Sequence, residues 1–148
     1  MQLSNLITPD RIVCFDGEDK AAALTRLLDA LGAAPEVGDP AALAEAMHKR
    51  EALMSTGIGL GIAVPHARTP RVQDLVLAVG VSKAGITYGS IDDGPVHVIV
   101  MVAAGAHQHE DYIQTLARVV LVLKNPKVRE ALMAAATAEA VYDVLSAY

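Results

Sequence analysis

The sequence predicts an α/β domain in which helices are layered on a β-sheet. Segments with helical spacing of apolar residues precede and follow a block of short apolar runs, and this order is typical of a buried sheet covered by helices. Apolar residues make up 53% of the chain and aromatic residues only 3%, so a core must be built from Ala, Val, Leu and Ile. The length of 148 residues suits one domain, which we expect to span residues 1–148.

The N-terminal part is expected to form a short strand and two helices. Arg11–Phe15 has the composition of a strand. Glu18–Leu31 is expected as a helix because four leucines recur along one face and a glycine follows. Asp39 is a good N-cap and Pro40 favours the first helical turn, so a second helix is expected from there to about Met54.

The middle and C-terminal parts are expected to form buried strands and then helices. Three apolar runs are bounded by turn residues, among them Gly85 and the segment 92–95, and such runs predict strands that are covered on both faces. These strands are Gly61–Val64, Leu75–Val81 and Val96–Ala103. The helices that follow are Glu110–Leu123, Pro126–Ala135 and Ala138–Ser146, with Thr137 as a further N-cap.

Charge and composition exclude several classes of protein. The net charge is −5 and no Lys/Arg cluster is present, which argues against nucleic-acid binding. The longest strongly apolar run, Val96–Ala104, is too short to cross a bilayer, and the N-terminus resembles no signal peptide. Cys14 is the single cysteine and is expected to be a buried, inert thiol. We therefore expect a cytoplasmic protein that reaches a membrane at most through its partners.

The segment from Ser55 to Arg68 carries the strongest functional signal. Gly57, Gly59 and Gly61 fall within five residues, and glycines at that density let backbone amides approach a ligand closely. Pro65 restricts the backbone just before His66, so the imidazole is presented at a defined place. A fixed imidazole beside an amide-rich loop indicates chemistry with an anion, and phosphate is the first candidate.

Known nucleotide motifs do not account for this loop. The chain has no Gly-x-x-x-x-Gly-Lys-Ser/Thr motif, which excludes a P-loop. A dinucleotide-binding turn follows a strand and opens a helix, whereas these glycines follow a helix and enter a strand.

Arg50 is a second candidate, on the helix that leads into the glycine loop. At 100° per residue it lies about 20° from Leu43, near the centre of the apolar stripe that includes Met47 and Met54. A guanidinium on an inward face needs a carboxylate or a bound phosphate, or else it must extend to solvent. Both interpretations stay open at this point.

The remaining histidines allow a metal-site interpretation. His107 and His109 could share a metal ion with His66 and a nearby acid such as Glu110, which would favour a metal-dependent hydrolase. Solvated loop histidines are the simpler interpretation. His97 lies inside an apolar strand and is expected to be a core or sheet-face residue.

Arg50-Glu51 and the block from Ser55 to His66 resemble the signature of EIIA domains of the bacterial phosphoenolpyruvate-dependent sugar phosphotransferase system. The branch is the fructose/mannitol type, which includes the stand-alone nitrogen-regulatory EIIA proteins. A looser likeness extends from Leu3 to the C-terminal helix. The resemblance implies an α/β fold with a mixed β-sheet flanked by helices on both faces.

The resemblance also implies a phosphocarrier or regulatory function. His66 would accept a phosphoryl group on Nε2 from a phospho-HPr-type donor, and Arg50 would neighbour the phosphate. The Thr56 hydroxyl and the amides of residues 56–61, which include Gly57, Gly59 and Gly61, would supply further donors. The phosphoryl group would pass to an EIIB domain, or the phosphorylation state would signal to a transporter or kinase. Such a site requires no cofactor, metal or nucleotide.

Two departures from the family pattern leave an alternative open. Ala67 stands where the family commonly has glycine, so the surroundings of the phosphate are expected to differ slightly. Tyr112 stands where a second histidine is usual, and His109 is a possible substitute. The alternative function is an interaction module that keeps the EIIA fold, is not phosphorylated, and regulates a transporter or kinase.

Overall fold

The structure is a computed structural model that describes residues 2–148. Its helical elements, in chain order, are the 3-10 helices η1 (Leu3–Leu6) and η2 (Pro9–Arg11) and the α-helices α1 (Lys20–Gly32), α2 (Pro40–Leu53), α3 (His109–Lys124), α4 (Pro126–Ala134) and α5 (Ala138–Leu145). Its strands are β1 (Ile12–Phe15), β2 (Gly57–Gly59), β3 (Ile62–Ala63), β4 (His66–Arg68), β5 (Val76–Ile86) and β6 (Val96–Ala104).

Within residues 2–148 the strands form one mixed six-stranded sheet. The strand order is β1-β5-β6-β3-β2, and β4 also pairs with β6. The pairs β1–β5, β3–β6 and β4–β6 are parallel, whereas β5–β6 and β2–β3 are antiparallel. The long strands β5 and β6 therefore form the centre of the sheet, and the short strands extend it on both sides.

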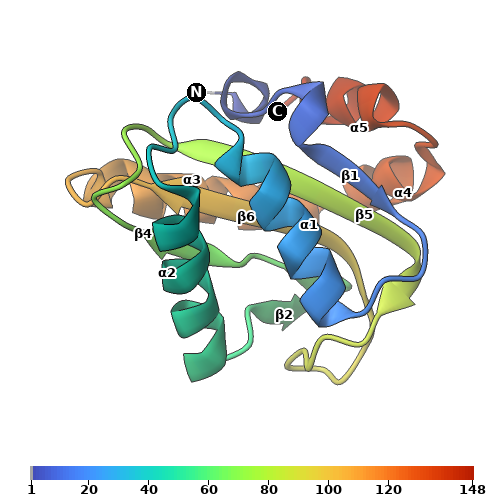
Figure 1. Cartoon of the computed structure of the whole chain (residues 1–148). Coiled ribbons are helices and arrows are strands. Elements are labelled where there is room, and N and C mark those ends of the chain that lie inside the picture. Colours follow the sequence, from blue (N-terminus) through green and yellow to red (C-terminus); the bar gives the residue numbers. More distant parts are fainter. Residues whose placement is uncertain (1) are drawn as a thin grey trace.

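Helices cover both faces of this sheet (Figure 1). Helices α1 and α2 lie on one face, over a core that includes the fully buried Leu27, Leu31 and Leu43. The C-terminal helices α3, α4 and α5 lie on the other face, over a second core that includes Val119 and Leu132. This arrangement confirms the α/β fold with a mixed sheet flanked on both faces.

Each expected helix is present, and its ends follow local capping chemistry. The Asp39 side chain accepts a hydrogen bond from the Ala42 amide, and Thr137 caps α5 through the Ala140 amide. Helix α1 begins slightly later than expected because Asp19 acts as its N-cap. Among residues 2–148 no helix is both long and apolar enough to cross a membrane.

The sequence pattern does not predict strands β2 and β4 or the continuation of β5 beyond Val81. Strands β2 and β4 were not expected, because three-residue strands are too short to produce a recognisable periodicity. Gly85 was expected as a turn, but it lies inside β5, where the register with β6 shifts and φ is +85°. Such an irregularity lets β5 continue to Ile86.

The three glycines of the loop serve the β2–β3 hairpin. Gly59 and Gly61 have φ of +88° and +76° at its turn, and Leu60 between them has φ of +59°. Gly57 lies so close to Ser90 that an added Cβ would stand 2.3 Å from its Oγ. The glycine spacing thus meets the steric needs of a tight hairpin.

The prediction of a buried Cys14 is wrong, because its side chain is exposed. Strand β1 lies at an edge of the sheet, and only Ile12 and Phe15 within it are buried. Cys14 lines an open cavity of about 430 Å³ together with Lys83 and Ala135.

Candidate functional site

His66 is the first residue of β4 and is held by the backbone just before it. Its Nδ1 lies 2.6 Å from the carbonyl oxygen of Val64. A carbonyl can only accept, so Nδ1 carries the proton and donates it, and Nε2 keeps a free lone pair. The half-buried ring lines a cavity of about 210 Å³.

The surroundings of His66 favour its neutral form. Burial of the ring lowers the pKa of His66 below its ordinary value of 6.5, and the Val64 hydrogen bond partly opposes this shift. The Arg50 guanidinium also lowers this pKa, whereas the Glu51 carboxylate raises it. A neutral imidazole with a free Nε2 is a competent nucleophile at neutral pH.

Arg50 lines the same cavity as His66 and comes from the last turn of α2. Its Nη1 donates to the Met54 carbonyl at 3.3 Å, and within residues 2–148 it forms no salt bridge. The side chain is half-buried rather than central in the apolar stripe, and Met54 is 71% exposed. The guanidinium thus lies beside His66 without a carboxylate to neutralise it.

The Tyr112 ring packs against His66 from the first turn of α3. The two ring centroids are 5.8 Å apart, and Tyr112 is buried. Burial raises the pKa of Tyr112 to about 12, so its hydroxyl stays protonated and can donate a hydrogen bond. His109 begins α3 and is exposed, so the structure brings Tyr112 rather than His109 against the imidazole.

Thr56 lines the cavity, but its donors are directed to Glu51. The Thr56 amide donates to Glu51 Oε2 at 2.9 Å, and its hydroxyl donates to Oε1 at 2.7 Å. The Thr56 hydroxyl is therefore bonded to Glu51 in this structure, and its contact with a phosphate stays a prediction.

The three loop glycines lie outside the cavity that contains His66. Gly57, Gly59 and Gly61 do not line the His66 cavity, and a Cβ added at Gly59 or Gly61 would stand 3.3 Å from the side chain of Asp92 or His97, respectively. The role of these glycine amides toward a phosphate stays a prediction.

Ala67 is buried in β4 opposite Ala103. Among residues 2–148 the non-glycine residues with positive φ are Leu60 and Asp93. Alanine therefore introduces no backbone strain beside His66.

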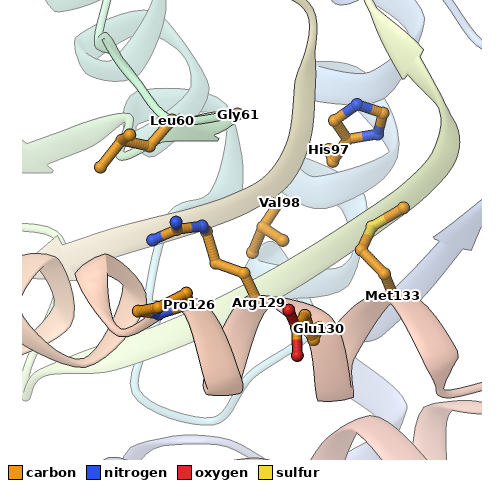
Figure 2. A pocket seen from close by; sticks show the side chains of 8 residues that line it. All are labelled: Leu60, Gly61, His97, Val98, Pro126, Arg129, Glu130 and Met133. Carbon is orange, nitrogen blue, oxygen red and sulfur yellow. The ribbon is translucent and has the colours of Figure 1, made fainter.

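A second cavity of about 390 Å³ lies between the β2–β3 hairpin, β6 and α4. Figure 2 shows the Arg129 guanidinium directed toward Leu60 and Pro126, with the His97 ring on the far side of the cavity. His97 Nδ1 donates to the Ser82 carbonyl at 2.8 Å, as fits a half-buried sheet residue. In the part of the chain that the structure describes, no three His, Cys, Asp or Glu residues are grouped to hold a metal ion.

Sequence reasoning missed two charged residues of the site. Glu51 continues the buried face of α2 four residues after Met47, so an i+4 count from Leu43 would have found it. Arg68 lies 5.9 Å from the centre of the Tyr112 ring and shares a strand face with His66. A strand predicted directly after Pro65 would have placed Arg68 on the same face as His66.

Comparison with known families gives one match over nearly the whole chain. The sequence profile described as "Phosphoenolpyruvate-dependent sugar phosphotransferase system, EIIA 2" matches residues 5–148. A fructose-specific EIIA component from Haloferax volcanii is 34% identical over 95% of this chain and 92% of its own length. A fructose-specific EIIABC component from Bacillus subtilis is 32% identical over 99% of this chain, which spans only 23% of that larger protein.

Solved structures share the fold. The nitrogen regulatory protein IIA-Ntr from Neisseria meningitidis superposes with a TM-score of 0.87, at 23% identity, over 97% of this chain and 98% of that one. Enzyme IIA for mannitol from Escherichia coli, in its complex with phosphorylated enzyme IIB, gives a TM-score of 0.81 at 23% identity, over 96% and 98% of the two chains. At this identity the likeness establishes the fold alone.

The geometry around His66 predicts an unusual titration. Nuclear magnetic resonance of protein with ¹⁵N-labelled histidine should show His66 with its proton on Nδ1 and with a pKa below 6.5. The Arg50→Ala substitution should raise this pKa, because a neighbouring positive charge is removed. A proton on Nε2 in the neutral ring, or a pKa at or above 6.5, would contradict the orientation described here.

Proposed function

The chain belongs to the EIIA 2 family of the phosphoenolpyruvate-dependent sugar phosphotransferase system, and we propose that His66 is the residue that carries its phosphoryl group. Membership gives the chain the phosphocarrier or regulatory role of an EIIA domain. The observation that carries the assignment to His66 is the pairing of a fixed imidazole, with Nε2 free, and an unneutralised Arg50 in one cavity. We treat residues 1–148 as one domain with this role.

The proposed reaction needs no acid or base at His66. The Nε2 lone pair attacks the phosphorus of a phosphohistidine donor, a new N–P bond forms, and the donor's N–P bond breaks. The released electron pair returns to the donor's nitrogen. The Val64 carbonyl accepts from Nδ1–H throughout and stabilises the positive charge that the phosphorylated ring acquires. Phosphoryl transfer of this kind depends mainly on alignment and on neutralisation of charge.

Arg50 supplies the charge neutralisation in this proposal. Its Nη1 is bonded only weakly, to the Met54 carbonyl at 3.3 Å, so the guanidinium can turn to the phosphoryl oxygens. The Tyr112 hydroxyl adds a neutral donor against the same ring, and Arg68 adds a second cation near Tyr112. In this proposal these side chains add to any donors that the main chain of residues 56–61 supplies.

We propose a phospho-HPr-type donor and, as acceptor, an EIIB domain or a regulated transporter or kinase. The E. coli mannitol enzyme IIA was solved with phosphorylated enzyme IIB, which supports transfer between such domains. Exposed apolar side chains line the His66 cavity, which suits contact with a protein partner: Met54 is 71% exposed and Ile58 is 39% exposed. Because a donor and acceptors of this kind act in the cytoplasm, we propose that the protein is cytoplasmic.

Phosphorylation in a reconstituted system tests the assignment to His66. Incubation with phosphoenolpyruvate, enzyme I and HPr should add one acid-labile phosphoryl group, seen by intact mass, and His66→Ala should abolish it. His107→Ala is the matched control, because that histidine is exposed, and it should keep the adduct. A folded protein that gains no phosphoryl group, beside a working EIIA control, would favour the unphosphorylated interaction module.

Arg50→Ala should slow phosphorylation far more than it affects stability. The half-buried guanidinium contributes one long hydrogen bond to the fold, whereas loss of a charged donor to a transferring group costs on the order of a hundredfold in rate. Rapid-quench rates and thermal melting give the two values. Lys49→Ala removes a neighbouring cation whose side chain is 79% exposed and should change neither. A large loss of melting temperature with normal transfer would make Arg50 a structural residue.

A further inference from the structure

Glu51 is a buried carboxylate that joins four parts of the fold. Its residue is only 9% exposed, on the sheet-facing side of α2. Its oxygens accept from the Thr56 amide, the Thr56 hydroxyl and the Tyr88 hydroxyl, and Lys20 Nζ lies 3.6 Å away. The carboxylate thus ties α1, α2, the segment before β2 and the segment after β5 together, and these partners offset the cost of its burial.

A short chain of hydrogen bonds continues from Glu51 to the imidazole. The Thr56 amide is bonded to Glu51, and the Thr56 carbonyl accepts from the Val64 amide at 3.1 Å. The Val64 carbonyl then accepts from His66 Nδ1 at 2.6 Å. Two residues, Thr56 and Val64, therefore separate the buried carboxylate from the ring.

Glu51 also fixes the helix end that carries Arg50. The two residues are adjacent in the last turn of α2, so the bonds from Glu51 to Thr56 hold the Arg50 backbone against the strand segment that leads to His66. The carboxylate is consequently bonded, through Thr56 and Val64, to the main chain that holds the imidazole, and it is adjacent to the residue that carries the cation.

Tyr88 and Lys20 contact Glu51 Oε1, the same oxygen that accepts from the Thr56 hydroxyl. Tyr88 is 3% exposed, and the Lys20 ammonium lies 4.2 Å from the centre of its ring. Burial and the Glu51 carboxylate raise the pKa of Tyr88, so its hydroxyl remains a donor. Neither Tyr88 nor Lys20 lines the cavity that contains His66.

We propose that Glu51 is a positioning residue for phosphoryl transfer: anchored by Tyr88 and Lys20, it aligns His66 through Thr56 and Val64 and aligns Arg50 through α2. This inference rests on the proposed function of His66. It assigns Glu51 no contact with the phosphoryl group, because its oxygens are occupied by Thr56 and Tyr88.

The effect of the Glu51 charge on the pKa of His66 distinguishes a positioning residue from a residue that only stabilises the fold. The charged and titratable groups around His66 are Arg50 and Glu51 from α2, Tyr112 from α3 and Arg68 from its own strand. Of these, the Glu51 carboxylate raises the pKa of His66. Removal of its charge should therefore lower that pKa, so the neutral ring should persist to more acidic pH.

Glu51→Gln tests the proposal, with Glu45→Gln as the matched control. Glu45 is on the same helix, and its side chain is 75% exposed. We expect Glu51→Gln to fold, to lower the pKa of His66, and to reduce the maximal phosphorylation rate on the order of tenfold to a hundredfold at saturating phospho-HPr. The phospho-HPr concentration at half-maximal rate should change little, because the docking surface is intact. Glu45→Gln should behave as the unsubstituted protein.

Tyr88→Phe is the second variant, which keeps the Glu51 charge and removes one of its anchors. It should slow phosphorylation less than Glu51→Gln does and should not lower the pKa of His66. A normal maximal rate in both variants would overturn the proposal, and so would a rate loss that only follows the loss of folded protein. If instead the unsubstituted protein takes phosphate elsewhere than His66, the proposed function fails, while the titration of unphosphorylated His66 still reports whether Glu51 acts on the ring.

Discussion

The parallel pairing of β6 with the chain on both sides of Pro65 is the constraint on which the site depends. Strand β3 pairs with Val98 and Ile99, and β4 pairs with Val102–Ala104. Proline has no N–H and interrupts the strand, yet its carbonyl accepts from the Val102 amide at 2.9 Å. The register is therefore kept across the interruption, and the ring of His66 can turn back to the Val64 carbonyl.

Adjacent residues of opposite charge complete the site from α2. Glu51 is buried and fully partnered, whereas Arg50 is half-buried and forms no salt bridge within residues 2–148. The i+4 progression of the buried face explains the difference, since Leu43 and Met47 lead to Glu51 and leave Arg50 at the margin. These are the positions that our proposals require, with Glu51 as a positioning residue and Arg50 as the cation that meets the phosphoryl group.

Local chemistry explains what the sequence could predict. Caps such as Asp39 and Thr137 fix helix ends within a few residues, so every expected helix was found. Strands β2 and β4 were missed because three-residue strands depend on tertiary pairing. His66 and Arg50 line one cavity, as the sequence predicts. The loop glycines form a tight hairpin, and the same glycine spacing would also suit a phosphate-binding loop, so the sequence alone does not distinguish the two. The long-range link from Glu51 to Tyr88, 37 residues apart, has no local signal.

The Val64 carbonyl binds Nδ1 of His66 and leaves Nε2 as the free ring nitrogen. The most direct test is a correlation spectrum of the phosphorylated protein with ¹⁵N-labelled histidine, which identifies the ring nitrogen coupled to phosphorus. We expect coupling at Nε2 of His66, with the proton retained on Nδ1 beside the Val64 carbonyl. Coupling at Nδ1, or on the ring of another histidine, would contradict it.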